Sequence, residues 1–165
     1  MSFKFVDLFA GIGGFHAALG ALGGECVYAS EWDEQARKTY EANFTKLSPS
    51  LFKKGNFAGD LTKVKKSEIP NFDILCAGFP CQPFSKSGKQ KGMDESRGTL
   101  FWNIAKIIET HKPSIVLLEN VRNIAGPRHI HEWEVIIQTL RDLGYRVSED
   151  PHVVSPHLIK PKFGG

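Results

Sequence analysis

Short apolar runs alternate with segments of helical spacing along most of the chain. In the helical segments the apolar residues recur every three or four positions, whereas the strand-like runs are short and bounded by glycine, proline or charged residues. The runs typical of strands are residues 3–9, 25–31, 57–61, 72–77, 114–118 and 145–148. The helical segments are residues 15–22, 33–44, 100–111 and 133–143. This alternation predicts an α/β fold, with an open, mostly parallel sheet and helices on both faces.

Two of the strand-like runs are predicted to lie inside this sheet. Residues 72–77 and 114–118 are mostly apolar on both faces, which is typical of strands covered by helices on either side. Residues 45–57 contain Ser48-Pro49-Ser50 and a lysine-rich stretch that ends at Gly55, and this composition predicts a loop. No repeat or change of composition marks a boundary, so we expect one domain over residues 1–165.

Length, charge and cysteine content narrow the class of protein. A chain of 165 residues is long enough for one domain with its own core, and its net charge of +3 permits a polyanionic partner without requiring one. The cysteines, Cys26, Cys76 and Cys81, include no pair at Cys-x2-Cys spacing, so we predict neither a disulfide scaffold nor a metal site. No apolar stretch approaches the roughly 20 residues of a membrane span. We therefore expect a cytoplasmic protein.

The glycine-rich stretch from Asp7 to Phe15 follows the first predicted strand. In an open parallel sheet the ligand site lies at the carboxyl ends of the strands, where glycines let the backbone turn tightly against a ligand. A dinucleotide-binding fingerprint would need glycine at positions 11, 13 and 16, but His16 occupies the last of these. The pattern therefore argues against NAD.

Two acidic residues end the next two predicted strands. Glu31 can accept hydrogen bonds from both hydroxyls of a ribose, and Asp60 from an adenine amino group. A ribose and an adenine without a diphosphate-binding loop suggest an adenosyl ligand such as S-adenosylmethionine. The alternative is that Glu31 only favours the start of a helix and that the glycines only form a turn.

Cys81 is the candidate nucleophile. It lies in Gly78-Phe79-Pro80-Cys81-Gln82-Pro83-Phe84-Ser85, where the flanking prolines hold the cysteine in a stiff turn after a buried strand. A thiol reacts as thiolate, which needs partial exposure and positively charged neighbours. Such neighbours follow closely: Lys86, Lys89 and Lys91. Cys26 and Cys76 fall inside predicted strands, so we expect them to be small buried hydrophobic residues.

Glu119 is the candidate acid. It follows the apolar run 114–118, so it is expected on the same rim of the sheet as Cys81. A carboxyl group in a partly dry pocket there can act as an acid or as a hydrogen-bond partner. The alternative is a carboxylate that caps the next segment.

Several stretches, in order along the chain, resemble the successive motifs of the cytosine-C5 DNA methyltransferases. They are Asp7 to Gly14, Glu31-Trp32, Gly59-Asp60-Leu61, Pro80-Cys81-Gln82, Arg97-Gly98-Thr99-Leu100-Phe101 and Glu119-Asn120-Val121. The resemblance covers residues 4–122 and continues more weakly beyond them. It implies the Rossmann-like fold of S-adenosylmethionine-dependent methyltransferases, S-adenosylmethionine as cofactor and double-stranded DNA as partner, as in restriction-modification systems. The implied cofactor-binding residues are Phe9, Gly11, Gly13, Glu31, Trp32, Asp60, Leu61, Pro80 and Leu100.

The resemblance also implies a mechanism. Cys81 would attack C6 of a cytosine flipped out of the duplex, which makes C5 nucleophilic enough to accept a methyl group. Glu119 would hydrogen-bond N3 and the exocyclic amine. Trp32 would pack against the adenine of the cofactor, with a place in the core as the alternative. A loop would close over DNA phosphates or remain a solvated charged segment, and its DNA-binding residues are Ser85, Lys86, Ser87 and Lys89.

The family pattern continues beyond residue 165, with a phosphate-gripping motif, a target-recognition region and a last antiparallel strand. We therefore expect an incomplete catalytic domain that lacks the last strand of its sheet and is inactive or weakly active alone. The chain is then either one part of a split enzyme, whose second polypeptide carries the target-recognition region, or a truncated piece of a longer protein. Two alternatives remain open, namely a non-catalytic cofactor-binding remnant and an enzyme that methylates cytosine in RNA.

Overall fold

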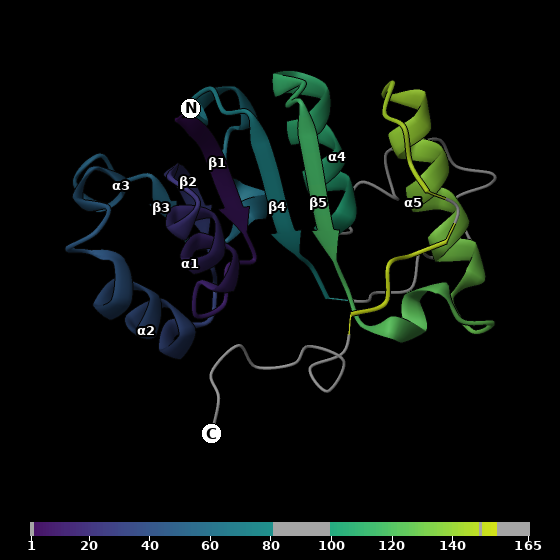
Figure 1. Ribbon diagram of the computed structural model, residues 1–165, viewed down its shortest axis with the longest axis horizontal. Coiled ribbons are helices and arrows are strands. Elements are labelled where there is room, and N and C mark those ends of the chain that lie inside the picture. Colours follow the sequence, from purple (N-terminus) through teal and green to yellow (C-terminus); the bar gives the residue numbers. More distant parts are fainter. Residues whose placement is uncertain (1, 81–99, 149, 155–165) are drawn as a thin grey trace. The chain divides into compact units, whose positions relative to one another are not determined.

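The computed structural model describes residues 2–80, 100–148 and 150–154 (Figure 1). The chain divides into two compact units, Met1–Asn120 and Val121–Gly165. The first unit contains the sheet.

The first unit is built on a five-stranded sheet in which all pairs are parallel. Its strands are β1 (Phe3–Leu8), β2 (Gly24–Ser30), β3 (Phe57–Ala58), β4 (Ile74–Gly78) and β5 (Ile115–Glu119). Their order is β3-β2-β1-β4-β5, so the chain first builds outward from β1 in one direction and then in the other. The predicted α/β fold with a parallel sheet is confirmed. Ligands of such sheets bind where the direction changes, at the carboxyl ends of β1 and β4.

In the described part of the first unit, four helices accompany the sheet. They are α1 (Gly14–Ala21), α2 (Glu34–Phe44), α3 (Pro49–Lys53) and α4 (Leu100–His111), with 3₁₀ turns η1 (Leu61–Lys63) and η2 (Lys66–Glu68). Helices α1 and α3 contact β2, whereas η1 and η2 contact α4. Connections between parallel strands are right-handed. The chain passes through α1 and α2 while it builds the sheet from β1 toward β3, and through α4 while it builds in the opposite direction, from β4 to β5. Helices α1 and α2 therefore lie on one face of the sheet and α4 on the other.

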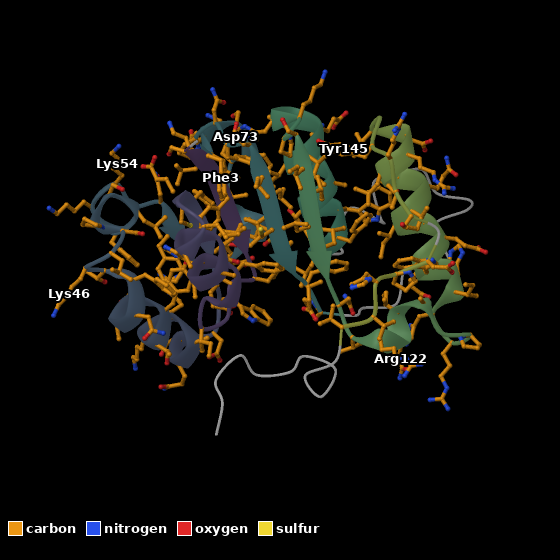
Figure 2. All side chains as sticks on the ribbon, viewed as in Figure 1. Phe3, Lys46, Lys54, Asp73, Arg122 and Tyr145 are labelled. Carbon is orange, nitrogen blue, oxygen red and sulfur yellow. The ribbon has the colours of Figure 1, made fainter. Side chains whose placement is uncertain are left out.

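Aromatic side chains fill the core beneath α1 and α2. One buried cluster contains Phe5, Tyr40, Phe44 and Phe57. It also contains Cys26 of β2 and Cys76 of β4, the two strands that flank β1. Both thiols are buried as predicted, and burial raises their pKa to about 12. On the outer side, Lys46 and Lys54 point away from this core (Figure 2).

Two predictions for the chain between β2 and β4 were wrong. The loop expected over residues 45–57 contains α3, because Ser48 precedes a proline at the first helical position and Leu51 is buried beneath the helix. The strand expected over residues 57–61 ends at Ala58, because Asp60 caps η1 and turns the chain.

Two further predictions, for the end of the chain, were also wrong. β5 is not buried on both faces: Ile115 and Leu117 are 48% and 40% exposed, because β5 is the outermost strand of the described sheet. Residues 145–148 form no strand, since no described strand pairs with them to satisfy their backbone groups. The second unit consists of η5 (Arg122–Ala125) and α5 (Ile130–Asp142) in its described part.

Candidate active site at the carboxyl ends of the strands

The turn between β1 and α1 has an unusual backbone. Phe9, Gly11 and Gly13 all have positive φ angles, of 55°, 55° and 96°. A side chain at Gly13 would collide with the ring of Phe44, because an added Cβ would lie 2.1 Å from Cε2. An added Cβ at Gly11 would meet nothing within 4 Å. The turn is therefore packed tightly against α2 at Gly13 and open at Gly11.

Glu31 ties this turn to the start of α2. Its Oε2 accepts a hydrogen bond from the backbone N–H of Gly11 at 2.7 Å, and its Oε1 accepts one from that of Asp33 at 2.9 Å. The residue is only 9% exposed. Each carboxylate oxygen keeps one further lone pair, so Glu31 can still accept hydrogen bonds from a ligand while it holds the turn.

Trp32 and Asp60 extend the site toward β3. Trp32 is 77% exposed, which excludes a place in the core. Asp60 accepts two hydrogen bonds at Oδ1, from the hydroxyl (2.7 Å) and the backbone N–H (2.9 Å) of Thr62, and these bonds lower its pKa. Its Oδ2 lies 3.7 Å from Nζ of Lys63. Leu61 follows with its side chain buried at the start of η1.

On the other side of β1, the ends of β4 and β5 meet. Gly78 pairs with Glu119, and a Cβ added at Gly78 would lie 3.3 Å from Oε2 of Glu119 and 3.9 Å from the carbonyl oxygen of Phe9. Asn120 donates a hydrogen bond to the carbonyl oxygen of Phe79 at 2.7 Å, which fixes the chain where it leaves β4. The ends of β1, β4 and β5 thus converge on one place.

The chain beyond β4 is described only in part. Pro80 is exposed, and Leu100, at the start of α4, is partly buried. Outside the described residues lie Cys81, Ser85, Lys86, Ser87 and Lys89.

Comparison with known proteins assigns the chain to a family. The family model described as C-5 cytosine-specific DNA methylase matches residues 3–157. The chain belongs to this family. It is 56% identical over 163 residues to the type II methyltransferase M.AluI of Cellulosimicrobium cellulans, and 50% identical over 142 residues to M.HhaI of Haemophilus parahaemolyticus. These alignments cover 99% and 86% of this chain but only 31% and 41% of the relatives, so the chain spans less than half of either protein.

Solved structures agree with the methylase fold. A DNMT2 structure from Spodoptera frugiperda superposes with a TM-score of 0.61 at 26% identity, over 86% of this chain and 41% of that one. A precorrin-6y C5,15-methyltransferase from Geobacter metallireducens reaches 0.56 at 16% identity, over 88% of this chain and 64% of that one, which shows the fold alone. Along the described ranges, no helix is long and apolar enough to cross a membrane.

The cofactor of this methylase family is S-adenosylmethionine. The described residues fit its adenosyl part, because open space at Gly11, the exposed ring of Trp32 and the two carboxylates of Glu31 and Asp60 follow the ends of neighbouring strands. A carboxylate suits ribose hydroxyls, and an indole ring suits the flat face of a base.

Asp7 was not selected as a site residue from the sequence. Its side chain is fully buried, and neither oxygen has a hydrogen-bond partner at normal distance within the described part of the chain. Burial raises its pKa to about 8, although the nearby backbone N–H of His16 lowers it. The sequence feature that could have identified Asp7 is its position as a lone acidic residue inside an apolar strand.

His16, at the position where a dinucleotide fingerprint requires glycine, joins three helices. Its Nδ1 lies 2.6 Å from the hydroxyl of Tyr40 in α2, and its Nε2 lies 2.9 Å from the hydroxyl of Ser48, which precedes α3. Its ring stacks on Phe44 at 3.9 Å, and burial lowers its pKa to about 4. In this chain a neutral imidazole therefore supports the turn from beneath.

Proposed function

We propose that this chain is the catalytic part of a DNA (cytosine-5-)-methyltransferase, which transfers a methyl group from S-adenosylmethionine to C5 of cytosine through a covalent adduct with Cys81. The observation that carries this proposal is the position of Glu119. Its Oε2 lies beside Gly78, and Gly78 precedes Cys81 by only Phe79 and Pro80. A carboxyl group and a thiol are thus attached to adjacent strand ends.

Three residues bind the nucleoside half of the cofactor in this proposal. Glu31 accepts from the ribose hydroxyls with its remaining lone pairs, Trp32 covers the adenine and Asp60 accepts from the amino group. Phe9, Gly11 and Gly13 form the turn over the middle of the cofactor, while Pro80 and Leu100 lie beside its methionine part. When bound, the cofactor supplies an electrophilic methyl group on a sulfonium.

The chain's own groups provide the remaining steps. The thiolate of Cys81 forms a bond to C6, and the electron pair of the C5–C6 double bond becomes available at C5. Glu119 donates a proton toward N3 and accepts a hydrogen bond from the exocyclic amine, which stabilises the charge that develops there. C5 takes the methyl group as its bond to the sulfonium sulfur breaks and S-adenosylhomocysteine leaves. A base then removes the C5 proton, and the bond between C6 and the cysteine sulfur breaks to restore the ring and the thiolate.

The target base lies outside the duplex during these steps, because C6 cannot be reached within the base stack. Ser85, Lys86, Ser87 and Lys89 contact DNA phosphates in this proposal. In this proposal the target sequence is recognised by a region outside residues 1–165, on a continuation of this chain or on a second polypeptide. The fact that the chain spans only 31% of M.AluI supports this part of the proposal.

A mechanism-based trap tests the proposal. The chain is incubated with S-adenosylmethionine and duplex DNA that contains 5-fluorocytosine, with and without the C-terminal part of M.AluI. The fluorine cannot leave as a proton does, so a methylated covalent complex accumulates and survives denaturing electrophoresis. We expect the complex when the C-terminal part is present, its loss in Cys81→Ser and its persistence in the matched variant Cys76→Ala.

If the cofactor binds but no complex forms with Cys81 intact and the C-terminal part present, the chain is not this enzyme. The same reaction with RNA in place of DNA identifies the substrate. If the covalent complex forms with RNA and not with DNA, the substrate of the proposed enzyme is RNA.

A further inference from the structure

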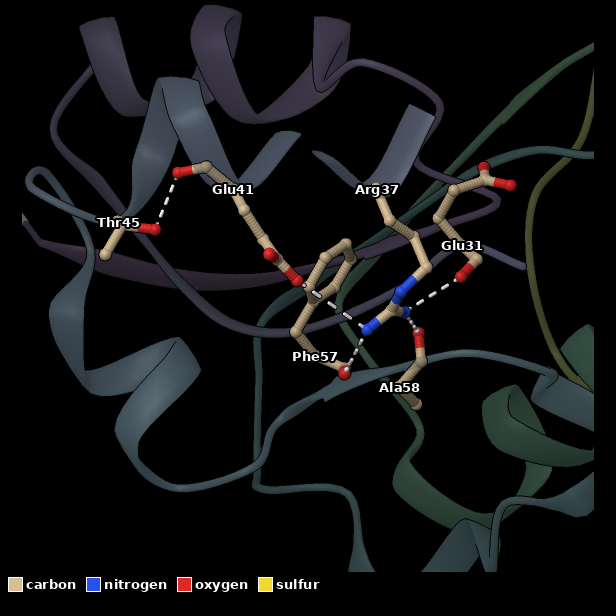
Figure 3. A network of polar contacts seen from close by, with 6 residues as sticks. All are labelled: Glu31, Arg37, Glu41, Thr45, Phe57 and Ala58. Atoms are coloured by element: carbon tan, nitrogen blue, oxygen red, sulfur yellow. Dashed lines mark hydrogen bonds and ion pairs between the residues drawn. The ribbon is translucent and has the colours of Figure 1, made fainter. Parts of the chain in front are cut away.

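Arg37, on the second turn of α2, binds the backbone behind two of the proposed cofactor-binding residues (Figure 3). Its Nη1 donates to the carbonyl oxygens of Glu31 at 2.9 Å and Ala58 at 2.5 Å, and its Nη2 donates to that of Phe57 at 3.3 Å. Figure 3 shows that Glu31 joins this network through its carbonyl group, while its carboxylate points away from the arginine. The guanidinium carbon lies 4.2 Å from the centre of the Phe57 ring.

The edge of the sheet at this point is short, with two residues of β3 paired to β2. β3 is two residues long, and near this end it is joined to β2 by bonds from Ala29 N–H to Asn56 and from Glu31 N–H to Ala58. The oxygen of Ala58 therefore accepts from both Glu31 and Arg37. Two of the three hydrogen bonds of Arg37 go to this short strand, at Phe57 and Ala58.

Arg37 reaches the chain immediately before Asp60. A Cβ added at Gly59 would lie 4.0 Å from Nη1 of Arg37. Because Arg37 holds Phe57, Ala58 and the carbonyl of Glu31 together, it fixes the distance between the chain segments that carry the two carboxylates. A lysine could not do the same, because a single ammonium lacks the planar fork that serves several carbonyls at once.

The arginine is engaged by the protein rather than free for a ligand. A hollow of about 440 Å³ lies beside it, but its side chain is only 25% exposed and its donors point at backbone carbonyls. The remaining ion pair, with Glu41, is long at 3.9 Å and lies on the surface, where such pairs contribute little. We infer that Arg37 is a positioning residue, which sets the separation of Glu31 and Asp60 and thereby the affinity for the nucleoside half of S-adenosylmethionine; this rests on the proposed roles of both carboxylates.

The test is calorimetric titration of the full chain with S-adenosylhomocysteine and with 5′-methylthioadenosine, which lacks the amino-acid end. Arg37→Met keeps the stem over Phe57 but removes every donor, and we expect it to weaken both ligands by a similar factor of about ten. Arg37→Lys should fall between this variant and the unchanged chain. The matched control Glu41→Gln removes only the ion pair and should leave both affinities within about twofold.

Different results separate this inference from the proposed function. If the unchanged chain does not bind S-adenosylhomocysteine, the proposed cofactor site fails, and the inference fails with it. If the unchanged chain binds and Glu31→Gln weakens binding, but Arg37→Met and Arg37→Lys bind normally, only the role of Arg37 is refuted. Loss of S-adenosylhomocysteine binding with normal 5′-methylthioadenosine binding would also refute it, because the damage would then lie at the amino-acid end.

A separate variant measures whether a general loss of stability by itself lowers ligand affinity. Ile108→Val, in the core and two turns further along α4 than Leu100, should cost about 1 kcal/mol of stability. If it lowers ligand affinity as much as Arg37→Met does, the effect of Arg37 is only structural. If Arg37→Met does not fold, Arg37→Lys decides the outcome by the same two titrations.

Discussion

Substitution of Gly13 by alanine tests how the turn after β1 is held. The methyl group would enter space that belongs to α2, at 2.1 Å and 2.8 Å from two atoms of the Phe44 ring and 3.1 Å from Cδ2 of Tyr40. Neither ring can withdraw easily, because Phe44 stacks on His16 and Tyr40 stacks on Phe57. The substitution therefore affects both the backbone and the core.

The magnitude follows from two costs. An L-residue at a φ of 96° has the left-handed strain of roughly 1–2 kcal/mol that glycine avoids. Forcing an extra methyl group into a packed core costs roughly a further 1–3 kcal/mol. We expect Gly13→Ala to lower the free energy of unfolding by about 2–5 kcal/mol, a large part of what holds a domain of this size.

The assay is equilibrium urea unfolding followed by circular dichroism, with Gly11→Ala as the matched control. Gly11 also has a positive φ but an added Cβ meets nothing, so this variant should cost only the strain of roughly 1–2 kcal/mol. Gly11→Ala should instead weaken cofactor binding, because it fills the open side of the turn. Combining Gly13→Ala with Phe44→Leu should cost at least about 1 kcal/mol less than the sum of the two single variants.

Equal costs for Gly13→Ala and Gly11→Ala would refute this reasoning, because the contact with Phe44 would then contribute nothing. Additive effects of Gly13→Ala and Phe44→Leu would refute it equally, since removal of the ring would not have relieved the collision.

Three further predictions concern single residues of the site. In the folded chain the carboxyl group of Asp7 has a pKa of about 8, whereas its ordinary value is 3.8. The contribution of Asp7 to stability therefore falls as pH rises from about 4 to 8. Asp7→Asn should flatten this decline, measured by urea titrations between pH 6.5 and 8. The imidazole of His16 has a pKa of about 4 instead of 6.5. Its contribution to stability is therefore complete above pH 6.5 and is lost as pH falls toward 4, by up to about 3 kcal/mol. His16→Gln should remove this loss of stability at low pH. Trp32→Ala should change stability by less than about 0.5 kcal/mol, because the ring is 77% exposed, yet weaken S-adenosylhomocysteine about tenfold in calorimetry.

Each of these three predictions can be contradicted by a specific result. An unchanged pH profile in Asp7→Asn or in His16→Gln would mean that the carboxyl or the imidazole titrates normally in the folded chain. Normal affinity in Trp32→Ala would remove Trp32 from the cofactor site.

The order of the elements was predictable because most of them have a distinct hydrophobic spacing and several, such as α1, α4 and α5, are followed closely by a glycine or proline. Helix α3 was missed although Ser48-Pro49 is a helix-start signal, since the lysines and Gly55 that follow are typical of loops. The exposure of β5 could not be predicted from its apolar residues, because a strand's burial depends on its place in the sheet, and the sequence does not state strand order.

The positions of Glu31 and Asp60 at strand ends were predictable from local pattern alone. Their tertiary partners were not: Glu31 accepts from Gly11, which is 20 residues away, and Arg37 donates to carbonyls 20 and 21 residues further along. No local rule marks an arginine on a polar helix as the one that reaches back to the sheet. Backbone carbonyls, moreover, are present at every residue and leave no sequence signal.

Helix α2 links these observations, although the proposal places none of its own side chains on the cofactor. Arg37, Tyr40 and Phe44 are spaced three and four residues apart, so they share one face of the helix. Arg37 holds the ends of β2 and β3, Tyr40 fixes the ring of His16, and Phe44 lies directly beneath Gly13. Because one rigid helix supports both the glycine turn and the strand ends behind the carboxylates, a shift of α2 would move both at once. We therefore expect substitutions on this face of α2 to weaken cofactor binding, and substitutions at exposed positions of the same helix to leave it unchanged.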